Sequence, residues 1–211
     1  MDEGKKIQIA GLFEFVQATF PEFQVLNTSD KWLLIRNYSR SFSCLDSAFR
    51  VLRTFGRNSN VIFGSYTTYL SWDCLYQYLP GPDCPDQSNV EIAEMTLHET
   101  FQLCVSMKNA ICRCNISEEE FCALMALAFW SFENIDVCEE LQQLAVRYRT
   151  SIIAELTTRY RETIGEENGA SRIGSLMCVL QEVRNLAENL TTSFEIFRIL
   201  GVFNDDTVIY K

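Results

Sequence analysis

The chain has 211 residues, of which 47% are apolar and 12% aromatic, and this composition predicts one packed globular domain and excludes a disordered chain. Its formal net charge of −10 argues against direct binding to nucleic acid, since that affinity rests largely on lysine and arginine side chains. No apolar run is long enough to span a bilayer and the first residues carry no signal-peptide pattern, so no membrane contact is expected.

Cysteine and histidine often carry metal sites, but here they form no recognisable set. The nine cysteines are odd in number, contain no CxxC pair and lie mostly inside apolar helical patterns. This usage predicts reduced core thiols in an intracellular protein. Cys112 and Cys114 with the lone His98 fit no standard zinc spacing, so no metal site is predicted. We expect His98 to be packed or exposed rather than catalytic.

The first part of the chain predicts two helices joined at a proline. Apolar residues recur at helical spacing from about Lys5, and Pro21 ends the pattern. The polar run NTSD, residues 27–30, then supplies cap residues for a long helix that reaches about Phe55. Because WLLI, residues 32–35, is apolar on all sides, this helix is expected to begin in a central, buried position.

A short β or irregular element follows. From Gly56 to Pro85, turn residues alternate with β-branched and aromatic ones, which favours a hairpin or an irregular loop. Helical periodicity resumes near Asn89, on an apolar face that contains Leu97 and Phe101.

Two further helices have predicted capping boxes at their starts. Ser117 and Glu120 form such a box ahead of an apolar run that we expect to be central. Asp136 and Glu139 repeat the pattern before a helix that runs to about Ile164.

The last predicted helix carries a seven-residue apolar repeat. GEENG, residues 165–169, breaks the chain ahead of it. From Ile173 to Phe197 the apolar residues alternate steps of three and four, and at about 1.5 Å per residue this helix crosses the domain. Such a repeat packs into the core, or shares that role with a homo- or heterodimer interface formed by residues 172–200. The outer face is expected to present Arg172, Gln181, Arg184 and Asn185.

No catalytic pattern occurs in the sequence. It has no phosphate-binding glycine loop, HExxH or GxSxG motif, and one histidine with scattered acids assembles no catalytic set. The sequence therefore predicts an all-α binding module with one short β element rather than an enzyme, and no catalytic residue is proposed.

The joint between the first two helices also resembles a family signature. Phe23, Leu26, Asp30 and Lys31 read FxxLxxxDK ahead of WLLIR. This resembles the signature FxxLxxxDQxxLLK of nuclear receptor ligand-binding domains, with lysine in place of the usual glutamine. The capped SEEEFCALMALAFW resembles the eighth helix of that family, and residues 172–200 resemble its tenth-to-eleventh helix. The DK variant, an AFR segment and a late FEIFRIL are most similar to the nematode-expanded branch.

The resemblance covers nearly the whole chain and implies an antiparallel three-layer helical sandwich around a lipophilic pocket. It identifies residues 1–211 as a single ligand-binding domain of a transcription factor, located in the nucleus, with the cytoplasm left open. No DNA-binding domain is expected in this chain. Relative to the family, the chain is expected to lack the first helix and to stop at DDTVIYK, where the activation helix would start. A fragment and an abbreviated gene product both remain open.

The resemblance also implies a ligand site. The family often places an arginine of its fifth helix at the polar end of the ligand, and Arg50 occupies that position. A buried arginine needs a partner, which the carboxylate of a ligand such as a fatty acid would supply. An ion pair with a protein acid is an equal alternative. Cys44 and Ser47 should share the face of Arg50, and Ile9 and Phe13 either face the ligand or pack in the core. No cofactor is expected beyond such a ligand.

The resemblance also implies a groove for coregulator helices, but this chain matches fewer of the family's groove residues than of its ligand-site residues. The family holds an LxxLL helix between a lysine of its third helix and a glutamate of its activation helix. Ala18 stands at the lysine position, and Glu14 replaces an apolar groove residue. Ligand-switched activation is therefore only one outcome beside corepression, dimerisation and constitutive behaviour. The residues expected to line the remaining groove are Lys31, Trp32, Ile35 and Arg36.

Two functions compete at this point. The first is a receptor domain that regulates transcription by binding a hydrophobic small molecule and recruiting coregulators. The alternative is a ligand-independent helical interaction scaffold whose pocket is filled by its own side chains. The scaffold predicts that Arg50 pairs with a protein carboxylate and that no cavity of about 300 Å³ or more remains.

Overall fold

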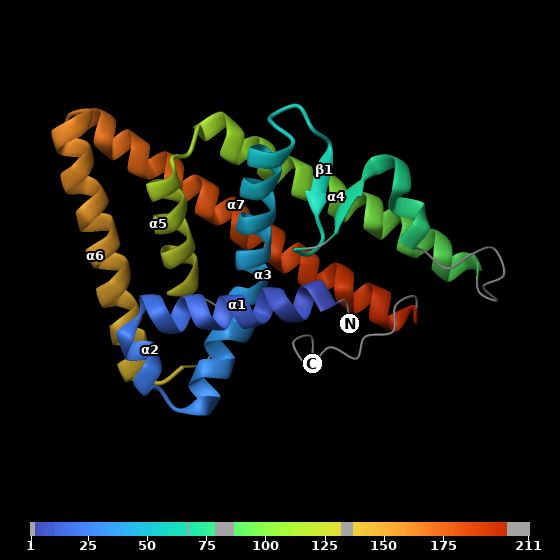
Figure 1. The fold of residues 1–211 in the computed structure, drawn as a ribbon, viewed down its shortest axis with the longest axis horizontal. Coiled ribbons are helices and arrows are strands. Elements are labelled where there is room, and N and C mark those ends of the chain that lie inside the picture. The colour runs from blue at the N-terminus through green and yellow to red at the C-terminus, as the bar shows by residue number, and fades with distance from the viewer. Residues whose placement is uncertain (1–2, 67, 79–86, 132–136, 202–211) are drawn as a thin grey trace.

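Helices make up most of the architecture, and one short hairpin interrupts them (Figure 1). The computed structural model describes residues 3–66, 68–78, 87–131 and 137–201. These ranges confirm the predicted all-α fold with a short β element. The elements in chain order are α1 (Glu3–Thr19), α2 (Pro21–Val25), α3 (Thr28–Thr54), β1 (Val61–Phe63), β2 (Tyr69–Ser71), the 3₁₀ helix η1 (Trp72–Tyr78), α4 (Gln87–Cys114), α5 (Glu118–Phe129), α6 (Glu139–Thr163) and α7 (Glu166–Ile199).

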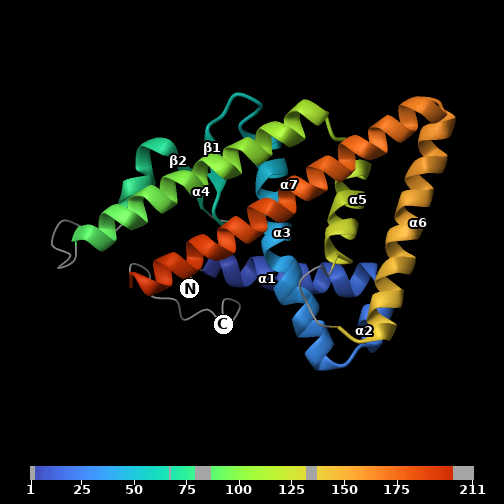
Figure 2. The same ribbon diagram turned by 180° about the vertical axis from the view of Figure 1, so that it is seen from behind.

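The helices lie in three layers around α3. α1 crosses one face of α3, and α4 and α7 lie together on the opposite face, as the two opposed views show (Figures 1 and 2). α5 lies beside α3 in the middle layer, and α6 contacts both α5 and α7 at one end of the molecule. Because α4 and α7 run in opposite directions, the arrangement confirms the predicted antiparallel sandwich.

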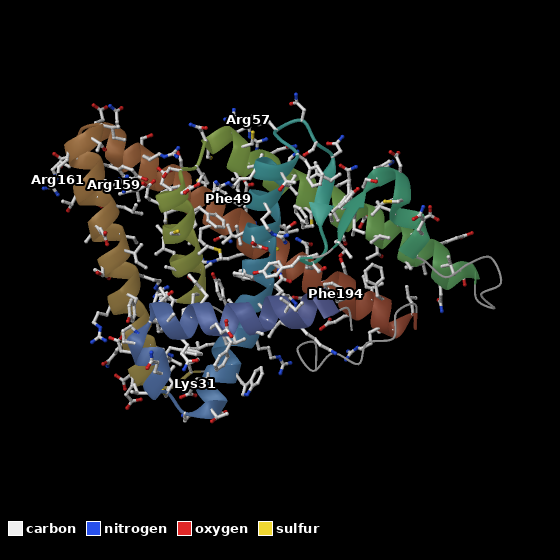
Figure 3. The ribbon with its side chains drawn as sticks, viewed as in Figure 1. Lys31, Phe49, Arg57, Arg159, Arg161 and Phe194 are labelled. Carbon is white, nitrogen blue, oxygen red and sulfur yellow. The ribbon has the colours of Figure 1, made fainter. Side chains whose placement is uncertain are left out.

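The joint between α1 and α3 is built as its sequence predicts. Pro21 is the first residue of α2, where a helix needs no N–H donor. Asn27 is the N-cap of α3, and its side chain accepts a hydrogen bond from the Asp30 N–H at 2.8 Å. Lys31 Nζ donates to the Gln24 carbonyl at 2.7 Å, so this lysine, labelled in Figure 3, ties the start of α3 to the end of α2.

An aromatic cluster fills the core where α1, α5 and α6 meet. Phe20 stacks on Phe129 with ring centroids 5.0 Å apart, and Trp130 stacks on Tyr148 at 4.6 Å. Phe129 and Trp130 are fully buried. Stacked and edge-on rings of this kind add to the burial of apolar surface, so the cluster anchors one end of the domain.

The start of α3 is only half buried, which corrects the expectation for WLLI. Leu34 and Ile35 are buried, but the Trp32 side chain remains 53% exposed. Four consecutive helical residues point in all directions. Neighbouring elements cover only one side of this turn, so an all-apolar run does not by itself place a helix end inside the core.

The helix starts confirm one predicted capping box and correct the other. The Ser117 N–H donates to Glu120 Oε2 at 2.8 Å, and the Glu120 N–H donates to Ser117 Oγ at 3.2 Å, which completes the box of α5. Asp136 lies outside the described residues. The N-cap of α6 is Cys138, without a side-chain cap bond, so Glu139 is the first helical residue rather than the third and the second box is wrong.

The break ahead of the last helix is shorter than GEENG predicts. Of these five residues only Gly165 lies outside α7, with φ of +85°, a left-handed conformation that glycine adopts at low cost. α7 begins at Glu166 and runs for 34 residues. The prediction that residues 166–169 belong to the break is therefore wrong, because Glu166 and Glu167 suit the positive start of a helix.

Candidate functional site

A cavity of about 210 Å³ lies between α3, the β1–β2 hairpin, α4 and α7. Small-molecule sites usually start near about 300 Å³, so a bound ligand has to be small or has to displace wall side chains. The wall is mainly apolar and includes Val51, Ile62, Leu75, Phe101, Leu186 and Phe197.

Two hydroxyl groups of the cavity wall, those of Ser47 and Thr100, are engaged by other protein groups. Ser47 Oγ donates to the Phe63 carbonyl at 3.1 Å and accepts from the Phe63 N–H at 3.0 Å, which ties α3 to β1. Thr100 Oγ1 lies 2.7 Å from the Thr96 carbonyl and 2.8 Å from Ser193 Oγ, between α4 and α7. These bonds join α3 to β1 and α4 to α7, and they leave the interior predominantly apolar.

Two of the predicted ligand residues reach this cavity. Cys44 and Ser47 both line it, from the face of α3 that looks toward α4. Cys44 is also buried in the hydrophobic core. The structure thus brings these two residues to one cavity, and their contact with a ligand stays a prediction.

Arg50 is occupied by the protein itself. Its Nε lies 2.9 Å from Asp46 Oδ2, one turn earlier on α3, and its Nη2 donates to the Ser65 carbonyl at 3.3 Å. The guanidinium also lies over the rings of Phe63 and Tyr66, 4.1 and 4.9 Å from their centroids. Arg50 is not among the described residues that line the cavity. Of the two partners expected for Arg50, the protein acid is the one present.

Ile9 and Phe13 lie away from the cavity. Neither is among the described residues that line it. Phe13 packs edge-on against Phe23 at 5.6 Å and lies 6.4 Å from the Trp32 ring, so it belongs to the packing between α1, α2 and α3. Ile9 is half-buried on α1. Phe13 therefore follows the core alternative given for it, whereas the role of Ile9 stays a prediction.

Sequence reasoning missed Lys108, a lysine in the cavity wall. It lies on α4 and is only 2% exposed. Its signal is present in the sequence, because Lys108 continues the apolar face of Phe101, Cys104 and Ile111 at helical spacing. Arg50 is a candidate because it is a charged residue within the apolar pattern of α3. The same reasoning applied to α4 identifies Lys108.

The residues predicted for a coregulator groove do not share one surface. Trp32 and Arg36 are exposed, but Ile35 is 1% exposed and belongs to the hydrophobic core, so it cannot line a surface groove. Lys31 is half-buried and bonded to α2. Arg36 borders a separate open groove of about 420 Å³ between α3 and α7.

The outer face predicted for the last helix is partly wrong. Arg172 pairs with Glu120 and Arg184 Nη2 donates to Ser131 Oγ at 2.8 Å, so both arginines turn toward α5. Gln181 and Asn185 are exposed, as predicted for the outer face, and Gln181 Nε2 donates to Asn185 Oδ1 at 3.0 Å.

The histidine is packed, but the expectation of core thiols holds only in part, since Cys44 is buried whereas Cys122, Cys138 and Cys178 are exposed. His98 stacks on Trp72 with ring centroids 4.6 Å apart. The eight described cysteines form no disulfide, and the described residues contain no group of three His, Cys, Asp or Glu side chains that would hold a metal ion. Within the described part of the chain, every helix is too short or too polar to cross a membrane.

Comparisons with known proteins agree with this architecture. The family described as the ligand-binding domain of nuclear hormone receptor matches residues 6–200. Nuclear hormone receptor family member nhr-22 of Caenorhabditis elegans is 26% identical over 203 residues, which cover 90% of this chain and 33% of the relative. Family member nhr-12 of the same organism is 22% identical over 200 residues, covering 93% and 43%. Family member nhr-11 is 24% identical over 211 residues, covering 95% and 44%. The chain therefore spans less than half the length of these relatives.

Proposed function

Because the chain belongs to the nuclear hormone receptor ligand-binding domains, on the nematode-expanded branch, we propose that it binds a lipophilic small molecule in the α3–hairpin–α4–α7 cavity. Through that ligand the domain regulates transcription in the nucleus. The apolar cavity is the single observation that carries the proposal, since its wall combines residues of α3, the hairpin, η1, α4 and α7, which are spread over the chain. Binding, rather than catalysis, is the activity that this family suggests.

The size and lining of the cavity favour a slender ligand such as a fatty acid. At about 210 Å³ the cavity is too small for a bulky polycyclic compound unless side chains move. Phe194, labelled in Figure 3, lines the cavity from the last turns of α7 and is 38% exposed. It stands between the interior and solvent, so rotation of this ring is the simplest way to admit a longer chain.

Protein partners are the second part of the proposal. Trp32 and Arg36 are the exposed members of the predicted coregulator groove, and they lie one turn apart on α3. Gln181 and Asn185 give α7 a polar outer face for a homo- or heterodimer contact. The net charge of −10 favours protein partners over nucleic acid for this chain.

Native mass spectrometry of gently purified protein tests the ligand proposal. We expect a complex that carries one lipophilic molecule and releases it on organic extraction. A chain that keeps its bare mass, and still keeps it after incubation with long-chain fatty acids, would contradict the proposal.

The alternative is a ligand-independent interaction scaffold, and two observations favour it. Arg50 pairs with Asp46, and the cavity volume of about 210 Å³ falls below about 300 Å³. This alternative predicts that side-chain packing already supplies the full stability of the domain. Saturating fatty acid would then leave the thermal midpoint unchanged, whereas a ligand in the cavity raises it by mass action.

A further inference from the structure

Lys108 places an ammonium group in the wall of the apolar cavity. Its side chain is 2% exposed. Nζ donates to the Arg57 carbonyl at 3.1 Å and to the Ser59 carbonyl. Both carbonyls belong to the loop directly after α3, where Figure 3 labels Arg57. These two bonds fix the position of the ammonium and leave its third N–H donor without a protein acceptor among the described residues.

No acidic side chain in the described part of the chain neutralises the charge of Lys108. Among the described residues, no carboxylate forms an ion pair with it, whereas Arg50 and Arg172 each have an acidic partner. Backbone carbonyls satisfy N–H donors but supply only partial negative charge. An isolated buried charge is unfavourable, and burial accordingly lowers the pKa of Lys108. An anion inside the cavity would remove this penalty.

We propose that Lys108 recognises the carboxylate of a fatty-acid-type ligand whose apolar chain fills the cavity. The inference rests on the proposed ligand-binding function and deepens it, because it assigns the chemical class of the head group. The remaining N–H of the Lys108 ammonium and its positive charge suit a single carboxylate oxygen. Along α3 the lining residues run from Arg40 to Val51, roughly 16 Å at about 1.5 Å per residue, which fits an extended chain better than a compact ring system.

The position expected for the head group moves from Arg50 to Lys108. The Arg50 guanidinium is held by Asp46, by the Ser65 carbonyl and by two aromatic rings, and it does not line the cavity. Arg40 is the other cation among the described wall residues, but it also borders the open groove between α3 and α7. Arg40 is therefore the competing anchor that an experiment has to separate from Lys108.

The test compares decanoic acid with 1-decanol, a neutral probe with the same chain length, on the 211-residue chain. Affinities are measured by displacement of a fluorescent fatty acid at neutral pH. For the wild type we expect decanoate to bind about tenfold more tightly than decanol, or better. Lys108→Met should remove this preference, Lys108→Arg should retain much of it, and Arg40→Gln should leave it in place.

The outcomes separate the anchor from the proposed function. If the wild type binds both probes equally, the cavity function stands and the anchor is wrong. If it binds neither, the proposed function itself fails. A preference that survives Lys108→Met but disappears in Arg40→Gln would assign the anchor to Arg40 and overturn the inference. Should Lys108→Met not fold, a crystal structure of the wild type with decanoate decides: the inference requires a carboxylate oxygen within about 3.2 Å of Nζ and fails without it.

Discussion

Glu120 of α5 and Arg172 of α7 form an ion pair whose contacts join four helices. Arg172 Nη2 lies 2.5 Å from Glu120 Oε2, and Arg172 Nη1 donates to the Cys114 carbonyl at the end of α4 at 2.6 Å. Tyr160 Oη of α6 donates to Glu120 Oε1 at 2.5 Å. One carboxylate therefore holds α5, α6 and α7 together at the end of the domain opposite the cavity.

Replacing Glu120 should lower stability without changing the ligand cavity. Glu120→Gln keeps the size of the side chain but leaves Arg172 without its anion, while the Arg172 side chain remains only 23% exposed. We expect a loss of about 2 kcal/mol in the free energy of unfolding, toward the low end for a broken buried pair because of that residual exposure. Urea denaturation followed by circular dichroism measures it, and a loss under about 0.5 kcal/mol would show that the pair contributes little.

The same carboxylate predicts a pH dependence. Burial raises the pKa of Glu120, but hydrogen bonds from Arg172, Tyr160 and the Ser117 N–H outweigh burial and lower it from 4.5 to about 2. A depressed acid pKa stabilises the folded state fully above about pH 4.5, and this contribution is lost as pH falls toward 2. The stability difference between wild type and Glu120→Gln should therefore shrink steadily from pH 5 to pH 3. A difference that stays constant over this range would contradict the assignment.

Two glycines of α7 should respond in opposite ways to alanine. A Cβ at Gly169 would lie 2.9 Å from Tyr160 Cβ, whereas a Cβ at Gly174 meets nothing within 4 Å. Gly174→Ala should stabilise the domain by about 0.5–1 kcal/mol through helix propensity alone. Gly169→Ala gains the same propensity but pushes α6 away, so a net loss of about 1–2 kcal/mol is expected. Thermal midpoints of the two variants give the comparison, and equal shifts would rule out close packing of α6 on Gly169.

The N-caps of α5 and α6 allow two opposite substitutions to be compared. Ser117→Ala removes the side-chain acceptor of the α5 capping box and should cost about 1 kcal/mol. Cys138 is the N-cap of α6 and makes no side-chain cap bond, although its backbone is already extended. Cys138→Asp should therefore stabilise by about 0.5–1 kcal/mol. Chemical denaturation of both variants checks the signs, and a destabilising Cys138→Asp would mean that the site cannot accept a cap.

Local patterns in the sequence predict the helices but not all the partners of buried charges. The Ser117 box and the Asn27 cap lie within four residues of their donors, so spacing alone reveals them. Asp46 precedes Arg50 by one helical turn, so the spacing alone also predicts this ion pair. Lys108 bonds to carbonyls about 50 residues earlier in the chain, and backbone carbonyls leave no residue-type signal.

The arginines of α7 show a related limit. A heptad pattern separates apolar from polar positions and therefore predicts that Arg172 and Arg184 lie on the outer face. Positions that flank an apolar stripe are partly covered by neighbouring elements, and a long arginine side chain there reaches Glu120 of α5 or Ser131 just after α5. The pattern predicted the helix correctly, but it could not tell which polar positions have partners across the helix interface.

The central claim is that the cavity between α3, the hairpin, α4 and α7 is the ligand site. Titration of a fluorescent fatty acid into wild type, Ala48→Phe and Ala154→Phe tests it most directly. Ala48 lines the cavity and its replacement fills much of the space, whereas Ala154 is exposed on α6 and controls for an added phenyl ring. We predict saturable one-to-one binding to wild type and Ala154→Phe, and affinity lowered by about tenfold or more in Ala48→Phe, with helical content preserved. Equal affinity in all three proteins, or no saturable binding to any of them, would contradict the claim.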